Sequence, residues 1–169
     1  MAIIKPNNNT LSAVTALPFG TGKVLQVVHK NLTSALSTNS TSYQDLDSQV
    51  FTPTSSSSKV FIMTTNHFFI GGSNAVNFRG AQVTILRDST TIATDGSTTS
   101  KYGSSYFIST ADDRMMNFKT IQLYDTPNTT NQVTYKIQYA SHNGRTTIYV
   151  NNNSYSEVRG KLTLMEIAG

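Results

Sequence analysis

The sequence predicts an all-β protein, an antiparallel jelly-roll-like β-sandwich with a short extended N-terminal arm. Charged residues make up only 13% of its 169 residues, about half the usual share of about 25%, and Ser, Thr and Asn take their place. The chain nevertheless contains 8 Tyr and 8 Phe and many Val, Ile and Thr, residues that favour strands and that disordered chains lack. It also has no leucine heptads and few residues of the kinds that build long helices. These three features together favour a β-sheet protein.

Two regions are predicted, an attachment arm over residues 1–22 and a β-sandwich domain over residues 23–169. The first region shows no strong periodicity and ends in a loop that contains Pro18, Gly20 and Gly22. It also carries apolar side chains that are costly to leave in water. We therefore expect the arm to dock on a partner through Ile3, Ile4, Leu11, Val14 and Leu17.

The body has the pattern of about eight to ten short strands joined by turns, which suits a double-sheet sandwich. The clearest alternation is "QVTYKIQYA" (132–140), where Val133, Tyr135, Ile137 and Tyr139 face one way. The segment 59–70 predicts a long central strand, buried on both sides at its start. Further strands are expected at 23–30, 42–46, 47–53, 81–90, 91–96, 99–110, 115–127, 146–153 and 161–167.

Turn signals predict how some of these strands connect. The "DST" sequence at 88–90 predicts a hairpin between 81–90 and 91–96. The Asn-Gly pair at 143–144 predicts a second hairpin, with 146–153 as the return strand of 132–140. Pro53 and the serine tract at 55–58 cannot easily extend a sheet, so we expect them to separate two strands as polar punctuation.

Charge and cysteine content exclude several classes of function. The net charge is +4 and the 13 basic residues are scattered, so no nucleic-acid footprint is predicted. The absence of cysteine excludes disulfides and cysteine-based sites. No stretch approaches about 18 apolar residues, so membrane insertion is not expected. The N-terminus lacks the apolar segment of a signal peptide, which predicts synthesis in a cytoplasm.

The search for a catalytic or metal site gives a negative prediction. His29, His67 and His142 lie far apart in the sequence and lack metal-ligand spacing. "GTGK" at 20–23 departs from a phosphate-binding loop, because a strand follows it instead of a helix.

The acidic residues are also interpreted as structural. Asp112 and Asp113 are adjacent in an expected loop, where a solvated turn is the simpler interpretation than a hydrolase pair. Asp45 and Asp47 lack the glycine and spaced third ligand of a calcium loop. We therefore predict no catalytic residues, no metal and no cofactor.

Aromatic residues in polar loops form the remaining candidate site. Tyr102, Tyr106, Asn151 and Tyr155 lie among Gly, Ser and Asn. Such combinations can build an adaptable recognition surface, so these residues are predicted receptor-contact positions. The alternative is that the tyrosines only support their loops.

Several segments resemble a known group of proteins when they are taken together. They are "GKVLQVV", "TSYQDL", "FTPTSSSSKVFIM", "VTILRDSTTIATDG", "YDTPNTTNQVTYKIQYA" and "KLTLMEIAG". Over residues 19 to 169 the chain resembles the small jelly-roll virion structural proteins of tailed phages, with a C1q- or TNF-like sandwich. The first 20 residues fit that pattern least.

The resemblance implies a non-enzymatic homotrimer in the virion, made in the host bacterial cytoplasm. Such proteins decorate or cement the capsid or form tail-fibre heads, so the implied partners are further copies of the chain, the major capsid protein or a tail component. The chain has no heptads, collagen-like triplets or β-helix repeat to serve as a shaft, which favours capsid decoration. The alternatives are a tail-fibre head, or a receptor-binding module for a host surface glycan. A polysaccharide hydrolase is disfavoured, because no catalytic constellation is found.

Overall fold

The computed structural model describes residues 22–33, 35–70, 79–93, 107–109, 115–142, 144, 147–151 and 159–169. Within these ranges the protein is all-β. The strands are β1 (Val24–Leu32), β2 (Leu36–Thr38), β3 (Gln44–Phe51), β4 (Lys59–Ile70), β5 (Arg79–Arg87), β6 (Thr90–Thr91), β7 (Phe107–Ser109), β8 (Met115–Asp125), β9 (Val133–Ser141), β10 (Ile148–Val150) and β11 (Gly160–Ile167). The predicted arm lies outside the described residues, apart from its last residue.

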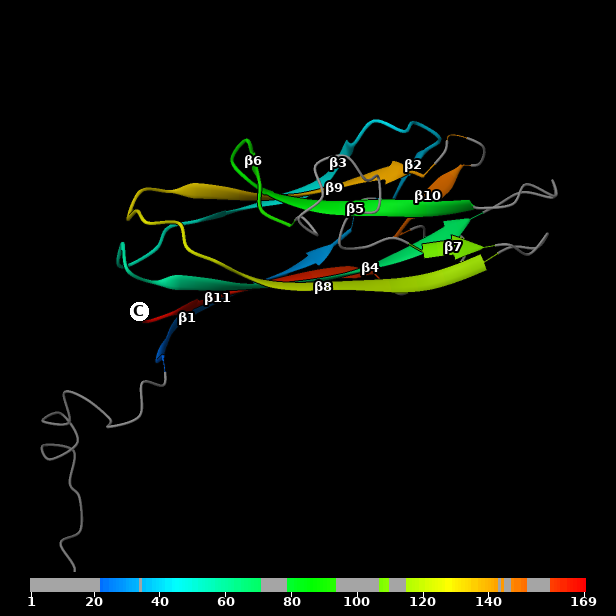
Figure 1. Ribbon diagram of the computed structural model, residues 1–169. Coiled ribbons are helices and arrows are strands. Elements are labelled where there is room, and N and C mark those ends of the chain that lie inside the picture. The colour runs from blue at the N-terminus through cyan, green and yellow to red at the C-terminus, as the bar shows by residue number, and fades with distance from the viewer. Residues whose placement is uncertain are drawn as a thin grey trace, which may run out of the picture.

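The strands form two antiparallel sheets that pack as a sandwich, which confirms the predicted fold class (Figure 1). One sheet has the order β1-β11-β4-β10-β2, with β8 on the other side of β4. The second has the order β3-β9-β5-β6, with β7 also paired to β5. In Figure 1 the first sheet, with β4 and β8, forms the lower layer, and β5 and β9 lie in the upper layer.

Strand β4 is the centre of the first sheet. Along its whole length, from Val60 to Ile70, it pairs with β8. On its other side it pairs first with β11 and then with β10. Strand β8 has no second partner among the described strands, so within the described part of the chain it lies at the edge of the sheet.

The core lies between the inner faces of the two sheets and follows the expected period of two. Strand β9 alternates as predicted, with its inward side chains buried. The largest buried side chains are Tyr135, Tyr139, Phe68, Leu32, Ile62, Ile70, Ile85, Ile137, Ile148, Leu162 and Leu164. They come from both sheets, so one continuous apolar layer joins the two.

The long strand at 59–70 differs from its prediction in one respect. Its first half alternates between buried and partly exposed side chains, and only the last five residues, 66–70, are continuously buried. Burial on both faces therefore occurs at the end of the strand and not at its start. The reason is that the outward side chains of the second half, His67 and Phe69, lie beneath neighbouring groups, as their exposed fractions of 1% and 4% show.

The two predicted hairpins have different outcomes. Strands β5 and β6 pair through Leu86 and Arg87, and Asp88 in the turn has a φ of 54°, which confirms the first hairpin. The second prediction is wrong. Gly144 does have the left-handed φ, 72°, that an Asn-Gly turn favours, but β9 and β10 belong to different sheets. Both edges of β9 are already paired with β3 and β5, so the chain crosses to the other sheet.

The serine tract has a more specific role than punctuation. It lies where the chain crosses between the sheets, from β3 to β4, and Thr54, directly before the tract, binds a buried carboxylate. The Thr54 amide and hydroxyl each donate to Glu166 Oε1 at 2.7 Å, and Gln26 Nε2 donates to Oε2 at 2.6 Å. Glu166 is fully buried. Burial alone would raise the pKa of Glu166, but these hydrogen bonds outweigh it and hold the pKa at about 2.

A buried ion pair fixes a second crossing, from β8 to β9. Arg87 Nη1 donates to both oxygens of Asp125, at 2.7 and 2.8 Å, and also to the Thr126 carbonyl. The Tyr135 hydroxyl donates to Asp125 Oδ2 at 2.8 Å. Burial and the neighbouring carboxylate raise the pKa of Tyr135, so this hydroxyl remains a donor. The cluster ties β5 and β9 of one sheet to the end of β8 in the other.

We predict an acid-dependent loss of stability that depends on Glu166. Its folded-state pKa, about 2, lies below the ordinary value of 4.5, so its stabilising effect is complete above pH 4.5 and is lost as the pH falls toward 2. The full effect corresponds to about 3 kcal/mol, at about 1.4 kcal/mol for each pKa unit. In denaturant unfolding between pH 2 and 7, the free energy of unfolding of the wild type should fall with decreasing pH over this range. The fall should be much smaller in Glu166→Gln. An equal dependence of the unfolding free energy on pH in the two proteins would show that Glu166 is not its cause.

The Arg87–Asp125 pair should matter far more than a surface pair. Arg87→Ala leaves a buried carboxylate without its cation, so the free energy of unfolding should fall by about 3 kcal/mol or more. The matched control is Lys136→Ala, which breaks the Lys136–Asp45 pair, where the Asp45 side chain is 59% exposed. That change should cost less than about 1 kcal/mol. Equal losses in the two variants, measured by urea unfolding, would show that Asp125 does not depend on Arg87.

Candidate functional site

The candidate site is the outer surface of the first sheet, on the side away from the core. Here it is called the apolar face, and it is built from β1, β11, β4 and β8, with β10 at one end. Alternate residues of each strand point outward, and the strand registers place them in rows across the sheet. Each row therefore shows which side chains lie next to one another.

The first row is entirely apolar apart from one phenol hydroxyl. The registers place Val27 beside Met165, Met165 beside Phe61, and Phe61 beside Tyr124. The ring centroids of Phe61 and Tyr124 are 5.1 Å apart. Val27 and Tyr124, at the two ends of the row, are both more than half exposed. This row presents a continuous apolar strip to the solvent.

Two polar rows cross the middle of the face. In one, His29 Nδ1 lies 3.0 Å from Thr163 Oγ1, and Gln122 Nε2 lies 3.6 Å from Met63 Sδ. In the next, the hydroxyls of Thr65 and Thr120 are 2.8 Å apart, and Lys161 pairs with Thr65 on the other side. These side chains satisfy one another, so the belt is polar but nearly uncharged.

The far end of the face is aromatic again. His67 pairs with Phe118, with ring centroids 4.9 Å apart, and Phe69 lies between Met116 and Tyr149. The centroids of Phe69 and Tyr149 are 5.8 Å apart. Phe118 and Met116 are both more than half exposed. Most of the exposed aromatic and methionine surface therefore lies along the edge strand β8.

His67 is the unusual polar group of this face. It is only 1% exposed, and its Nε2 has no hydrogen-bond partner. Burial lowers the pKa of His67, because the charged ring would lose its hydration. The imidazole is therefore held neutral in the fold, with one ring nitrogen unsatisfied.

The residues predicted from the sequence lie elsewhere. Ile3, Ile4, Leu11, Val14 and Leu17 of the arm lie outside the described residues, as do Tyr102, Tyr106 and Tyr155 of the predicted receptor loops.

Asn151, the remaining predicted receptor contact, lies in the interior. It is 1% exposed. Its side-chain Oδ1 accepts from the backbone amide of His67 at 3.1 Å, and its backbone amide donates to the His67 carbonyl at 2.9 Å. Its φ of 50° and the close approach of Gly160, where a Cβ would lie 2.7 Å from Nδ2, show a tightly fitted structural position.

Sequence reasoning missed the apolar face, although a signal for it was present. Along β8, Ile121 and Leu123 point inward, while Phe118 and Tyr124 point outward. A strand that is apolar on both sides is typical of burial on both faces. The outer side of β8 has no cover among the described residues, so the pattern predicts a partner.

No group of three or more potential metal ligands occurs in the described ranges. The described part of the chain also contains no helix long and apolar enough to span a membrane.

Comparisons with known proteins give little further information. No protein-family model matches the chain, and no curated protein matches it either. A chain in the structure of infectious bursal disease virus, Gx strain, is similar, with a TM-score of 0.45 and 12% sequence identity. The match covers 98% of this chain and 37% of the viral one, so the protein spans little more than a third of the length of that neighbour. At this TM-score the similarity assigns no function.

We predict that removing the unsatisfied ring nitrogen of His67 stabilises the fold. His67→Phe keeps an aromatic ring beside Phe118 and should raise the free energy of unfolding by about 1 kcal/mol at pH 7. Because the pKa of His67 is lowered from 6.5 in the fold, the unfolded chain takes up its proton first, and the wild type should lose stability as the pH falls below 6.5. The advantage of the variant should therefore grow between pH 7 and pH 5. If the difference in unfolding free energy between His67→Phe and the wild type does not change with pH, His67 is not held neutral in the fold.

Proposed function

We propose that the protein is a non-enzymatic structural protein of a tailed-phage virion, a homotrimer that decorates or cements the capsid. The apolar face is the observation that carries this proposal. Large exposed apolar patches on soluble proteins mark interaction sites, and this one combines Val27, Met116, Phe118 and Tyr124, all more than half exposed. The phage assignment is supported by the resemblance of the sequence, and the lack of catalytic motifs supports a structural role.

A second copy of the chain is the partner that best fits the apolar face. Among the described outward positions of β4 and β11 the basic residues are Lys161 and, at the end of the face, Lys59 beside Ile167, so two such faces can meet with only limited charge repulsion. Strand β8 pairs only with β4 among the described strands, and an open edge strand with exposed aromatic side chains invites uncontrolled association. Closed cyclic symmetry covers such an edge in a defined way. The absence of cysteine leaves burial between subunits as a source of added stability.

The N-terminal arm is proposed as the anchor. Its apolar residues precede β1, whose Val27 ends the first row of the apolar face. In this proposal the arm binds the major capsid protein or a tail component, while the sandwich forms the trimer and projects from the particle.

The mass of the purified protein in solution tests the subunit interface. We expect a trimer for the wild type and a monomer for the double variant Phe118→Ser, Tyr124→Ser, because both side chains are exposed and contribute little to the fold of one subunit. The matched control is Val50→Ser, since Val50 is 49% exposed but lies on β3 in the other sheet. Sedimentation equilibrium should find the control trimeric. A wild type that stays monomeric at high concentration would overturn the proposal.

Deleting residues 1–22 separates the two proposed parts. The truncated chain should remain trimeric and lose its binding to virions, which labelling with an antibody can follow. If the truncated chain becomes monomeric, residues 1–22 hold the subunits together. The proposal that two apolar faces form the subunit contact would then be wrong. Antibody signal confined to the tail would reject the capsid location.

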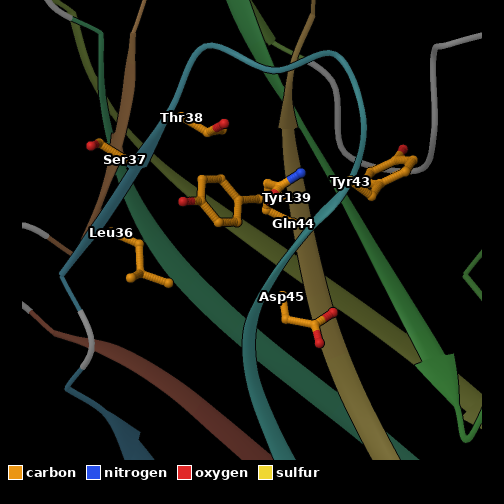
Figure 2. Close-up of a pocket in the computed structure, with 7 residues that line it drawn as sticks. All are labelled: Leu36, Ser37, Thr38, Tyr43, Gln44, Asp45 and Tyr139. Atoms are coloured by element: carbon orange, nitrogen blue, oxygen red, sulfur yellow. The ribbon is translucent and has the colours of Figure 1, made fainter.

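The second candidate function is a tail-fibre head or receptor-binding module for a host surface glycan. One observation favours it, a groove at the crossing from β2 to β3 (Figure 2), whose described lining is mostly polar: Leu36, Ser37, Thr38, Tyr43, Gln44, Asp45 and Tyr139. This groove is distinct from the apolar face and lies within one chain.

A further inference from the structure

The aromatic end of the apolar face reverses the usual pattern of a sandwich strand. Along this half of β8, Met116 and Phe118 point outward and are 55% and 53% exposed. Asn117 and Lys119 point toward the other sheet and are only partly exposed. An antiparallel strand with one solvated side normally places its polar residues outward and its apolar residues inward. The reversal indicates that the subunit contact of the proposed trimer is centred on this end of the face.

His67 lies directly beneath this end. It pairs with Phe118 across β4 and β8, and the two ring centroids are 4.9 Å apart at an angle of 43°. Asn151 holds its backbone, because the His67 amide donates to Asn151 Oδ1 and the His67 carbonyl accepts from the Asn151 amide. The side chain is 1% exposed, and its Nε2 has no hydrogen-bond partner. The imidazole is therefore buried between a fixed main chain and an exposed phenyl ring.

The described surroundings of His67 contain no carboxylate that could stabilise a charged ring. Its outward neighbours on β4, β8 and β10 carry no charge at neutral pH: Thr65, Phe69, Met116, Phe118, Thr120 and Tyr149. The charged residues at this end of the adjoining strands are basic: Lys161 and Arg159 at β11, and Lys119 on the inner side of β8. Glu166 and Asp125 both pair with Val60, at the far end of β4 and on its inner side. A protonated His67 would lose its hydration and gain no counter-charge, which is why burial lowers the pKa of His67.

The protonated ring has one route to water. Alternation along β4 directs His67 away from the core, so the ring can turn only to the outer side, past Phe118. In a single subunit the exposed Phe118 side chain can swing aside and open this route. In a trimer joined over Met116 and Phe118, the partner holds both side chains down. Proton uptake by His67 and subunit association therefore oppose each other.

We propose that His67 makes the subunit contact acid-labile, so that the trimer assembles at neutral pH and separates into folded subunits as the pH falls toward about 5. The inference rests on the proposed trimer and adds a means of regulating it. The pKa of His67 already lies below 6.5 in one folded subunit, and cover by a partner lowers it further. Association is therefore strongest above pH 6.5 and weakens as the pH falls, with each separating subunit taking up a proton on its imidazole.

The test is sedimentation equilibrium of the full chain at pH 7.5 and pH 5.5, with circular dichroism at both. The wild type should be trimeric at pH 7.5. The concentration at which half of the chains are assembled should rise about tenfold or more at pH 5.5, while the β-sheet spectrum is kept. His67→Phe and His67→Gln both remove the titrating group, so each should assemble equally well at the two pH values. The matched control is His29→Gln, which removes the exposed histidine of the same face and should keep the pH dependence of the wild type.

The outcomes separate this inference from the proposal on which it rests. A wild type that is monomeric at pH 7.5 would overturn the trimer itself. A trimer that does not weaken at pH 5.5, or that weakens equally in both His67 variants, would reject the role of His67 and leave the trimer standing. Loss of the pH dependence in His29→Gln alone would assign it to His29. Loss of the β-sheet spectrum together with dissociation would show that His67 acts on the fold of one subunit, and would also reject the switch.

Discussion

The structure depends on the pairing of β4 with three other strands. Its 12 residues hold β8 on one side and both β11 and β10 on the other, so a single strand joins segments from the middle and the end of the chain. Long-range pairing of this kind costs loop-closure entropy before any contact forms, and apolar packing of the inner face must repay that cost. Val60, Ile62 and Ile70 are fully buried, so the strand is both the main pairing partner of its sheet and a large part of the core.

Buried polar groups then fix where the chain crosses between the sheets. Glu166 accepts from Thr54, just before the serine tract, at the β3–β4 crossing, and Asp125 binds Arg87 and Tyr135 near the β8–β9 crossing. At the opposite end of the sandwich, Asn151 joins β4 to the turn after β10. Each of these groups has partners that offset its desolvation, so the polar interactions add specificity to an apolar core that alone would tolerate several connections.

The sequence was informative where the structure is local. Alternation in 132–140 and the turn after Arg87 follow from side-chain period and turn chemistry, and both were predicted correctly. The Asn-Gly pair was misleading, because turn chemistry sets the local φ of Gly144 but not the sheet in which the next strand finds a free edge. The apolar face was detectable in part, since β8 is apolar on both sides. The groove could not be predicted, because its residues come from β2, β3 and β9 and meet only through the crossing of the sheets.

The groove and the apolar face lie at different parts of the same sandwich. The apolar face is concentrated along β8, at one edge of its sheet, whereas the groove is beside β2, at the opposite edge and beyond β4 and β10. Subunits joined through the β8 side would therefore carry their grooves outward and leave them open. Several weak sites on one rigid particle act at high effective concentration, and linked binding of this kind can exceed the affinity of a single site by about 10²–10⁴. Under the second candidate function, a groove with modest affinity would then be enough to hold a particle on a surface that repeats the same ligand.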